Sequence, residues 1–146
     1  MKYWIIVASK DHIARGVADG FVQANHGKQA SLKRIHADDW VLIYSPKQTM
    51  EGTEPCKAFT AIGQAIGNEI YQHKMSEDFI PWRRDIRFYE NTETPIIPLI
   101  DKLDFIINKK SWGYAFRFGF LKIEEADFER IKAQMIKGEL ITLNNK

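Results

Sequence analysis

Short runs of β-branched and aromatic residues recur along this 146-residue chain, and they limit its possible folds more than any other feature. The runs predict strands over residues 3–8, 40–44, 57–66, 70–73, 84–89 and 117–123. Gly63 lies inside one run, and a glycine within a strand is typical of a bend or bulge at the corner of a small barrel. Short strands at this spacing indicate a closed or nearly closed antiparallel barrel.

Three segments have the apolar spacing of helices rather than strands. They cover residues 10–19, residues 99–107 and a final stretch that starts at Glu124 or Glu125 and reaches Gly138. The polar residues 47–55 lack any period and are expected to form a loop. The sequence therefore predicts an α+β fold, a mixed and mostly antiparallel β-barrel flanked by short helices.

The length and composition are those of one soluble globular domain covering residues 1–146, with 45% apolar and 27% charged residues. No stretch approaches the roughly 18 apolar residues of a membrane-spanning helix, so no membrane partner is expected. The N-terminal residues lead directly into a predicted strand without the pattern of a secretory signal, which predicts a cytoplasmic protein.

Neither a metal nor a cofactor is expected. The single cysteine, Cys56, excludes an intramolecular disulfide and a cysteine-based metal site. The four histidines are scattered, and none pairs with another at the spacing of metal ligands. The basic residues gather in several regions and the acidic ones near the C-terminus, which indicates one basic and one acidic face.

The segment from Gly20 to Lys28 has the composition of a binding loop. It combines an aromatic ring, amide side chains, a histidine, a lysine and glycines without an apolar period. Glycine lets a backbone approach a ligand closely, and polar side chains at the entrance of a pocket can form hydrogen bonds with the edge of a ligand. An ordinary surface loop rich in turn formers remains the other interpretation.

Several motifs occur in order through nearly the whole chain. They include Tyr3-Trp4-Ile5, Gly20-Phe21, His26-Gly27-Lys28, Asp39-Trp40, Tyr44-Ser45-Pro46, Phe59-Thr60-Ala61-Ile62-Gly63, Arg83-Arg84-Asp85, Trp112-Gly113 and Asp127-Phe128. Together they resemble the EVE domain family of the PUA-like superfamily, which also contains the YTH readers of methylated adenine in RNA. The resemblance implies a small PUA-like β-barrel with a pocket for a flipped or unpaired base, in particular a modified one, of RNA or DNA.

Reading a base requires flat surfaces against its ring and donors or acceptors around its edge. The candidate base-binding residues are Ser9, His12, Phe21, Gln23, His26, Lys28, Trp82 and Trp112. YTH readers place a tryptophan where this chain has Phe21-Val22, which is compatible with a roomier or differently shaped pocket. The candidate phosphate-binding residues are Lys10, Lys33, Arg83, Arg84, Lys109 and Lys110.

Two other classes of function stay open. His12 and His26 could form the acid–base pair of a small metal-free nuclease or amidohydrolase, with Lys28 stabilising a developing negative charge. The chain could also be a protein-interaction module with a vestigial pocket. The sequence favours a nucleic-acid reader, because it contains no nucleophile motif and no glycine-rich phosphate loop.

Overall fold

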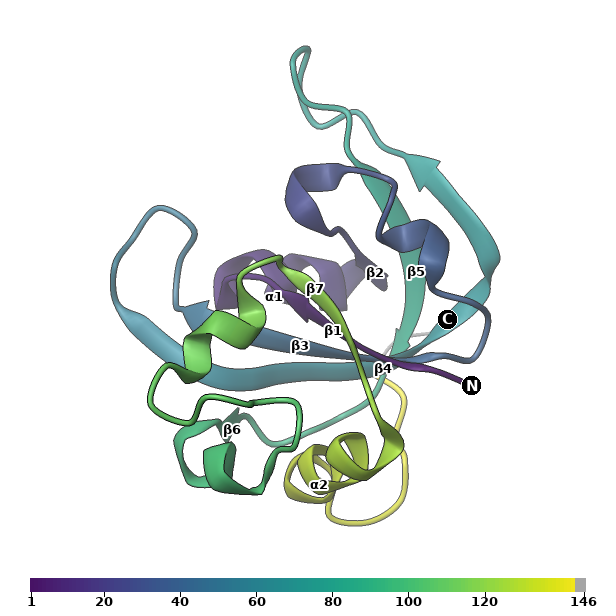
Figure 1. Cartoon of the computed structure of the whole chain (residues 1–146). Helices are drawn as coiled ribbons and strands as arrows, with labels where there is room; N and C mark the ends of the chain where they lie inside the picture. The colour runs from purple at the N-terminus through teal and green to yellow at the C-terminus, as the bar shows by residue number, and fades with distance from the viewer. Residues whose placement is uncertain (144–146) are drawn as a thin grey trace.

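A computed structural model describes residues 1–143 and builds them around one strongly curved sheet (Figure 1). The strands are β1 (Tyr3–Val7), β2 (Phe21–Val22), β3 (Trp40–Lys47), β4 (Pro55–Gln72), β5 (Trp82–Phe88), β6 (Thr94–Pro95) and β7 (Phe120–Ile123). The helices are α1 (Lys10–Asp19) and α2 (Glu125–Met135), and four 3₁₀ turns cover Asn25–Gly27, Leu32–Arg34, Ile97–Lys102 and Trp112–Phe116. Neither α1 nor α2 is long and apolar enough to cross a membrane.

The sheet is mixed and mostly antiparallel, as the sequence predicts, but it does not close into a barrel. Its strand order is β2-β5-β4-β3-β1-β7, with β6 paired to β4. Only β1 and β3 run parallel among the strands of residues 1–143. Of the two expected forms, closed or nearly closed, the structure does not have the closed one, because its end strands β2 and β7 pair only with β5 and β1 and not with each other.

The predicted strands over residues 57–66 and 70–73 are parts of the single 18-residue strand β4. Its pairing with β5 shifts register between Ala65 and Ile70, so a bulge and not a turn separates the two halves. The predicted end of β3 at Tyr44 is also wrong, since the strand continues through Pro46 to Lys47. Pro46 is exposed and lies where the pairing of β3 with β4 shifts, at a position that tolerates the missing N–H.

Other boundaries differ more modestly. The predicted helix over residues 99–107 is the 3₁₀ turn Ile97–Lys102, which has a proline in its first turn. Strand β7 begins at Phe120 and not at Arg117, because the preceding residues Trp112–Phe116 form another 3₁₀ turn. Helix α2 starts at Glu125 as predicted and ends at Met135, before Gly138.

The sheet separates two hydrophobic cores. Strand β1 alternates between them: Ile5 packs with the core that includes Phe128 of α2, whereas Trp4 and Ile6 pack with the core that includes Ile13 of α1. Helices α1 and α2 therefore cover opposite faces of the sheet, and the hairpin between β4 and β5 projects from the α1 side (Figure 1).

Candidate functional site

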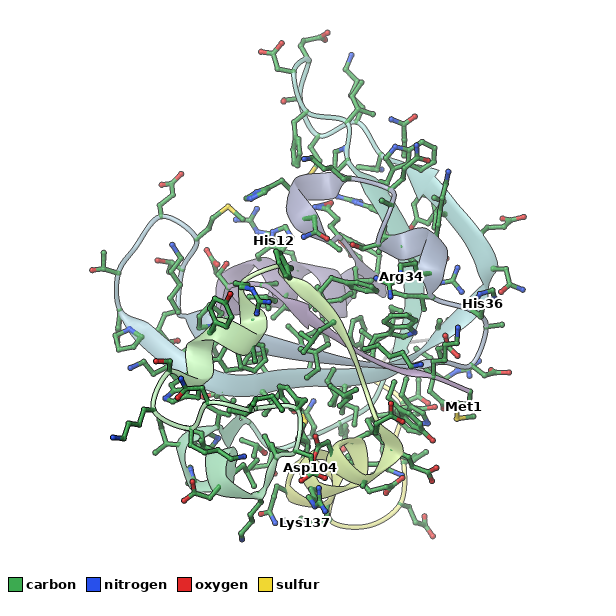
Figure 2. All side chains as sticks on the ribbon, in the orientation of Figure 1. Met1, His12, Arg34, His36, Asp104 and Lys137 are labelled. Carbon is green, nitrogen blue, oxygen red and sulfur yellow. The ribbon has the colours of Figure 1, made fainter. Side chains whose placement is uncertain are left out.

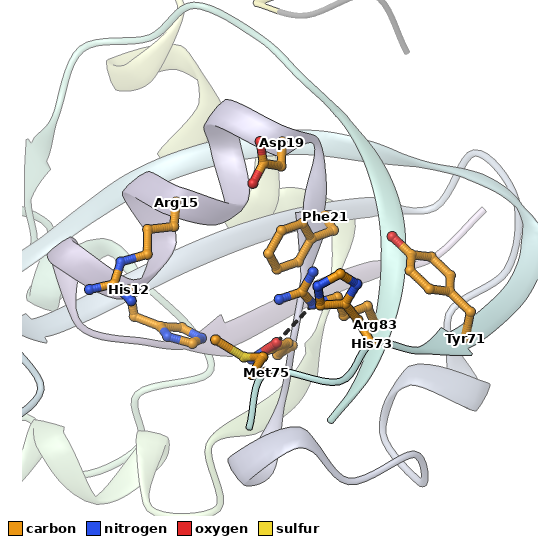
Figure 3. A pocket seen from close by; sticks show the side chains of 9 residues that line it. His12, Arg15, Asp19, Phe21, Tyr71, His73, Met75 and Arg83 are labelled. Atoms are coloured by element: carbon orange, nitrogen blue, oxygen red, sulfur yellow. Dashed lines mark hydrogen bonds between the residues drawn. The ribbon is translucent and has the colours of Figure 1, made fainter. Parts of the chain in front are cut away.

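A cavity of about 440 Å³ opens between α1, β2 and the base of the β4–β5 hairpin (Figure 3). Its lining residues are His12, Arg15, Asp19, Phe21, Gln23, Tyr71, His73, Met75 and Arg83. This volume lies within the range of about 300–1,000 Å³ that is typical of small-molecule sites. The cavity therefore has room for one nucleobase and its sugar.

A stack of Arg83 on Phe21 forms one wall of this cavity. Strand β5 pairs with β2 beside these residues, and the guanidinium carbon of Arg83 lies 3.8 Å from the centroid of the Phe21 ring. The Arg83 Nε donates a hydrogen bond of 3.1 Å to Gln23 Oε1, drawn as a dashed line in Figure 3. Neither terminal nitrogen of Arg83 has a hydrogen-bond partner within residues 1–143, so both can donate to a ligand.

The neighbouring Arg84 points to the other face of β5 and cannot bind a phosphate from there. Its side chain is fully buried, and its guanidinium donates to the backbone carbonyls of Gly67 and Glu69 at the bulge of β4. The prediction that Arg84 binds phosphate is therefore wrong, because the residue closes a backbone irregularity inside the protein.

His12 lines this cavity and also a second one of about 500 Å³, which the loop between β3 and β4 encloses with α1. Burial lowers the pKa of His12; Asp11 opposes this effect, while Arg15 and Arg83 reinforce it. The lowered pKa favours the neutral imidazole at pH 7. The Asp11 carboxylate accepts from Ser9 Oγ at 2.6 Å, from the His12 N–H at 2.8 Å and from the Met50 N–H at 3.2 Å.

His12, Phe21, Gln23 and Arg83 are the predicted residues that the structure brings together. Ser9 is buried and donates to Asp11 outside the lining. His26, Lys28, Lys33 and Lys110 are exposed elsewhere, and Trp82 and Trp112 are half-buried against the two cores.

Two predicted phosphate ligands have partners within the protein. Lys10 forms a 2.8 Å ion pair with Glu93. The ammonium group of Lys109 donates to the carbonyls of Ile100 at 3.1 Å and Leu103 at 2.7 Å, where it caps a 3₁₀ turn. These contacts make both lysines poorer candidates for phosphate binding than Arg83.

Five lining residues are not among the predicted ones: Arg15, Asp19, Tyr71, His73 and Met75. Their spacing along the sequence could have identified them. Arg15 and Asp19 follow His12 at helical spacing on α1, so the three side chains share a helix face. Tyr71 near the end of β4 and His73 and Met75 just after it alternate along the chain, which is compatible with one side of the hairpin.

Gly27 permits the close approach of another part of the protein, Pro81, and not of a ligand. A Cβ at this residue would lie 2.4 Å from Pro81 Cβ, and its φ of +82° is unfavourable for other residues. The loop that follows β2 is thereby packed against the base of the β4–β5 hairpin. His26, just before it, is exposed and outside the cavity, so the structure does not form the expected pair of His12 with His26.

The described residues contain no group of three or more histidine, cysteine or acidic side chains that could hold a metal ion. The candidate site is thus a cavity of cationic, aromatic and amide groups with one carboxylate, Asp19, at its edge (Figure 3). Such a surface can hold a planar ring and donate hydrogen bonds to it.

Comparisons with known proteins identify the family. The EVE domain family model matches residues 2–134. The chain is 50% identical over 135 residues to a UPF0310 protein of Mycobacterium avium, covering 92% of this chain and 98% of that protein. It is 49% identical over 129 residues to the UPF0310 protein in the gntR 5′ region of Bacillus licheniformis, covering 88% of each.

Solved structures resemble this fold at low sequence identity. The NMR structure of Rpa0253 from Rhodopseudomonas palustris has a TM-score of 0.55 at 14% identity, over 92% of each chain. The crystal structure of a mutant ZmASCH protein from Zymomonas mobilis has a TM-score of 0.55 at 8% identity, over 93% of this chain and 100% of that one. The α+β class that the sequence predicts is confirmed, and the chain belongs to the EVE domain family.

Proposed function

We propose that this protein binds nucleic acid and holds one unpaired base in the cavity beside Phe21 and Arg83. The stacked Arg83 carries the proposal. One face of its guanidinium lies on an aromatic ring, and its terminal nitrogens line the cavity without a partner among the described residues. A planar cation in this position can stack on a base or donate two parallel hydrogen bonds to it.

The hydrogen-bonding pattern favours a base that presents acceptors. Gln23 uses its Oε1 to accept from Arg83, which leaves its amide N–H groups as donors. Arg83 has only donors, so this wall matches ring nitrogens and carbonyl oxygens such as those of cytosine or guanine. The thioether of Met75 also lines the cavity and would contact an apolar substituent such as a methyl group.

The neutral His12 fits the same function. An uncharged imidazole can donate through one nitrogen and accept through the other, so it reads a base edge without attracting every anion. The absence of His26 from the cavity weakens the enzyme hypothesis, because the expected acid–base pair is not formed. Whether the polymer is RNA or DNA, and which modification fits, is decided by the experiment that follows.

The test compares wild type with Arg83→Met, which preserves most of the stacking area over Phe21 but removes all donors. Both proteins are titrated with short RNA and DNA oligonucleotides, each containing one modified cytosine, adenine or uracil. We expect selective binding by wild type and a loss of roughly 10- to 100-fold in the variant, the usual worth of hydrogen bonds to a charged group. Lys137→Gln, an exposed change beside α2, is the control and should bind normally.

Equal and weak binding to every oligonucleotide, unchanged in Arg83→Met, would contradict the proposal. Incubation of the same oligonucleotides with the protein, followed by mass spectrometry, tests the enzyme alternative in parallel. Cleavage or base conversion that disappears in His12→Gln would favour an enzyme.

A further inference from the structure

A second aromatic and cationic cluster is exposed beyond the cavity. Arg117 lies between two rings, with its guanidinium carbon 3.7 Å from the centroid of Tyr114 and 4.4 Å from that of Phe118. Its Nη1 also donates to the Tyr114 carbonyl at 2.8 Å, which fixes the guanidinium between the rings. Tyr114 is 64% exposed and Phe118 70% exposed, so the protein itself covers little of either ring.

Trp112 anchors this cluster to the core. Its ring makes an edge contact with Tyr44 at a centroid distance of 6.4 Å, and Phe116 stacks on Tyr44 at 4.1 Å. The turn Trp112–Phe116 therefore directs two aromatic rings inward and leaves Tyr114 outside. An exposed aromatic pair on a rigid turn is more typical of a binding surface than of a structural one.

The cluster lies where two long segments without acidic residues meet. Neither residues 20–37 nor residues 105–123 contain an Asp or Glu, although the chain has 19 of them. The basic residues of these segments are Lys28, Lys33, Arg34, Lys109, Lys110, Arg117 and Lys122. This bias in charge suits a polyanion and disfavours an apolar protein partner.

One hydrogen bond joins the two segments next to the cavity, and a second, within residues 20–37, orients its donor. Asn25 Nδ2 donates to the Phe118 carbonyl at 2.7 Å, and Ser31 Oγ donates to Asn25 Oδ1 at 2.5 Å. Gln23, which lines the cavity, is two residues before Asn25, a span of at most about 7 Å along the backbone. The loop that contacts the cluster at the Phe118 carbonyl therefore begins next to a residue that lines the cavity.

We propose that Tyr114, Arg117 and Phe118 form a second nucleic-acid contact, which stacks a base adjacent in the strand to the one in the cavity. The proposal rests on the proposed function. The rings bind the neighbouring base through its face, and Arg117 pairs with the intervening phosphate. Stacking on an aromatic face is tolerant of sequence, so this contact adds affinity while the cavity supplies selectivity.

The test uses fluorescently labelled pentadeoxycytidylate, which can span both sites, and dCMP, which can fill only the cavity. The double variant Tyr114→Ser/Phe118→Ser should lose about tenfold or more in affinity for the pentanucleotide, as expected for one stacked base, and bind dCMP like wild type. Arg117→Gln should reduce the salt dependence by roughly one phosphate contact. Ile97→Ser, an exposed apolar residue outside both segments, is the matched control.

Unchanged pentanucleotide affinity in the double variant would overturn this second contact, whatever Arg83→Met does. Arg83→Met should lose affinity for both ligands. If it binds both normally while the double variant loses pentanucleotide affinity, the base pocket is overturned and the surface contact stands. Failure of wild type to bind the pentanucleotide at low salt would overturn the second contact, because stacking accepts any base, and the titrations with modified oligonucleotides would then decide the base pocket alone. Thermal unfolding of each variant checks that it is folded.

Discussion

At the scale of single residues, the buried Asp39 shows what a sequence motif can contribute to folding. Its carboxylate accepts hydrogen bonds of 2.9 Å from the Trp4 indole, from the Lys2 N–H and from the His36 N–H. It therefore ties the start of β1 to the turn before β3, the only parallel pairing among residues 1–143. Burial would raise the pKa of Asp39, but the three donors more than offset this and lower it.

We expect Asp39→Asn to lower the free energy of unfolding at pH 7 by about 1–3 kcal/mol. The substitution removes the negative charge and replaces one of the two acceptor oxygens by an NH₂ donor. A lowered carboxyl pKa contributes stability above the unfolded value of about 3.9, and this stability disappears as pH falls through the folded value. The variant should therefore lose less stability than wild type on acidification from pH 5 to pH 3. Urea unfolding across that range measures both effects.

Asp38→Asn is the matched control, because Asp38 is exposed and its φ of +70° is one that asparagine tolerates. It should keep the stability of wild type. A wild-type protein whose unfolding free energy does not fall from pH 5 to pH 3 would contradict the role given to Asp39.

The site residues also differ in whether the sequence could predict them. Phe21 and Gln23 could be predicted, since they come from one segment whose polar and aromatic mixture is unlike a core. Arg83 and Arg84 could not be distinguished, because adjacent strand residues face opposite sides and the sequence does not say which side holds the cavity. Pairing of Val22 with Arg84 fixes that choice.

At the scale of elements, the long strand β4 depends on a glycine at its centre. A Cβ at Gly63 would lie 2.5 Å from the Arg87 carbonyl oxygen and 2.6 Å from Ile86 Cγ2. Strand β5 therefore lies closer to β4 at this residue than a side chain larger than hydrogen allows. The sequence predicts a bend or bulge at this glycine, but the bulges lie elsewhere in β4, and Gly63 instead permits close packing of two paired strands.

We expect Gly63→Ala to destabilise the protein by about 1–3 kcal/mol, the usual cost of forcing extra atoms into a packed core. The clash is with backbone and a buried side chain, so it cannot be relieved by a rotamer change. Gly138→Ala is the control, because nothing lies within 4 Å of its added methyl group. Equal melting temperatures for the two variants would contradict the close approach of β4 and β5.

The sequence predicts where strand residues occur better than it predicts how many strands they form. Gly67 and Asn68 resemble a turn in sequence, but both halves of β4 pair with β5 around a bulge and so remain one strand. The buried Arg84 supports that bulge through the Gly67 and Glu69 carbonyls. A residue 15 or more positions away thus decides a local structure, which a reading of neighbouring residues cannot detect.

At the scale of the whole molecule, the charges are distributed unevenly although the net charge is only +2. The acidic residues of the C-terminal region lie on or beside α2, on the opposite side of the sheet from α1. Figure 2 shows His12 on the α1 side and Asp104 and Lys137 near α2. Helix α2 also carries Arg130 and Lys132, and α1 carries Asp11 and Asp19, so the uneven charge belongs to the acid-free segments 20–37 and 105–123 and not to the two sides of the sheet.

This distribution predicts salt-dependent binding of oligonucleotides despite the low net charge. Each phosphate contact to a single strand contributes a slope of about −0.7 in log K against log salt, so two to four contacts imply about −1.5 to −3. Titrations at several salt concentrations measure the slope. Lys137→Gln, on the α2 side, should leave it unchanged, whereas affinity that is independent of salt would contradict a phosphate-binding face.

The sequence by itself determined the family, the α+β class, helix α1 and the segment that supplies Phe21 and Gln23, because these follow from local periodicity and from motifs in fixed order. Only the tertiary structure decided that the sheet stays open, that Arg83 and not Arg84 reaches the cavity, and that His73 and Met75 join it. Those outcomes depend on strand register and on contacts between distant segments. A chain's local preferences do not encode such contacts until the strands have paired.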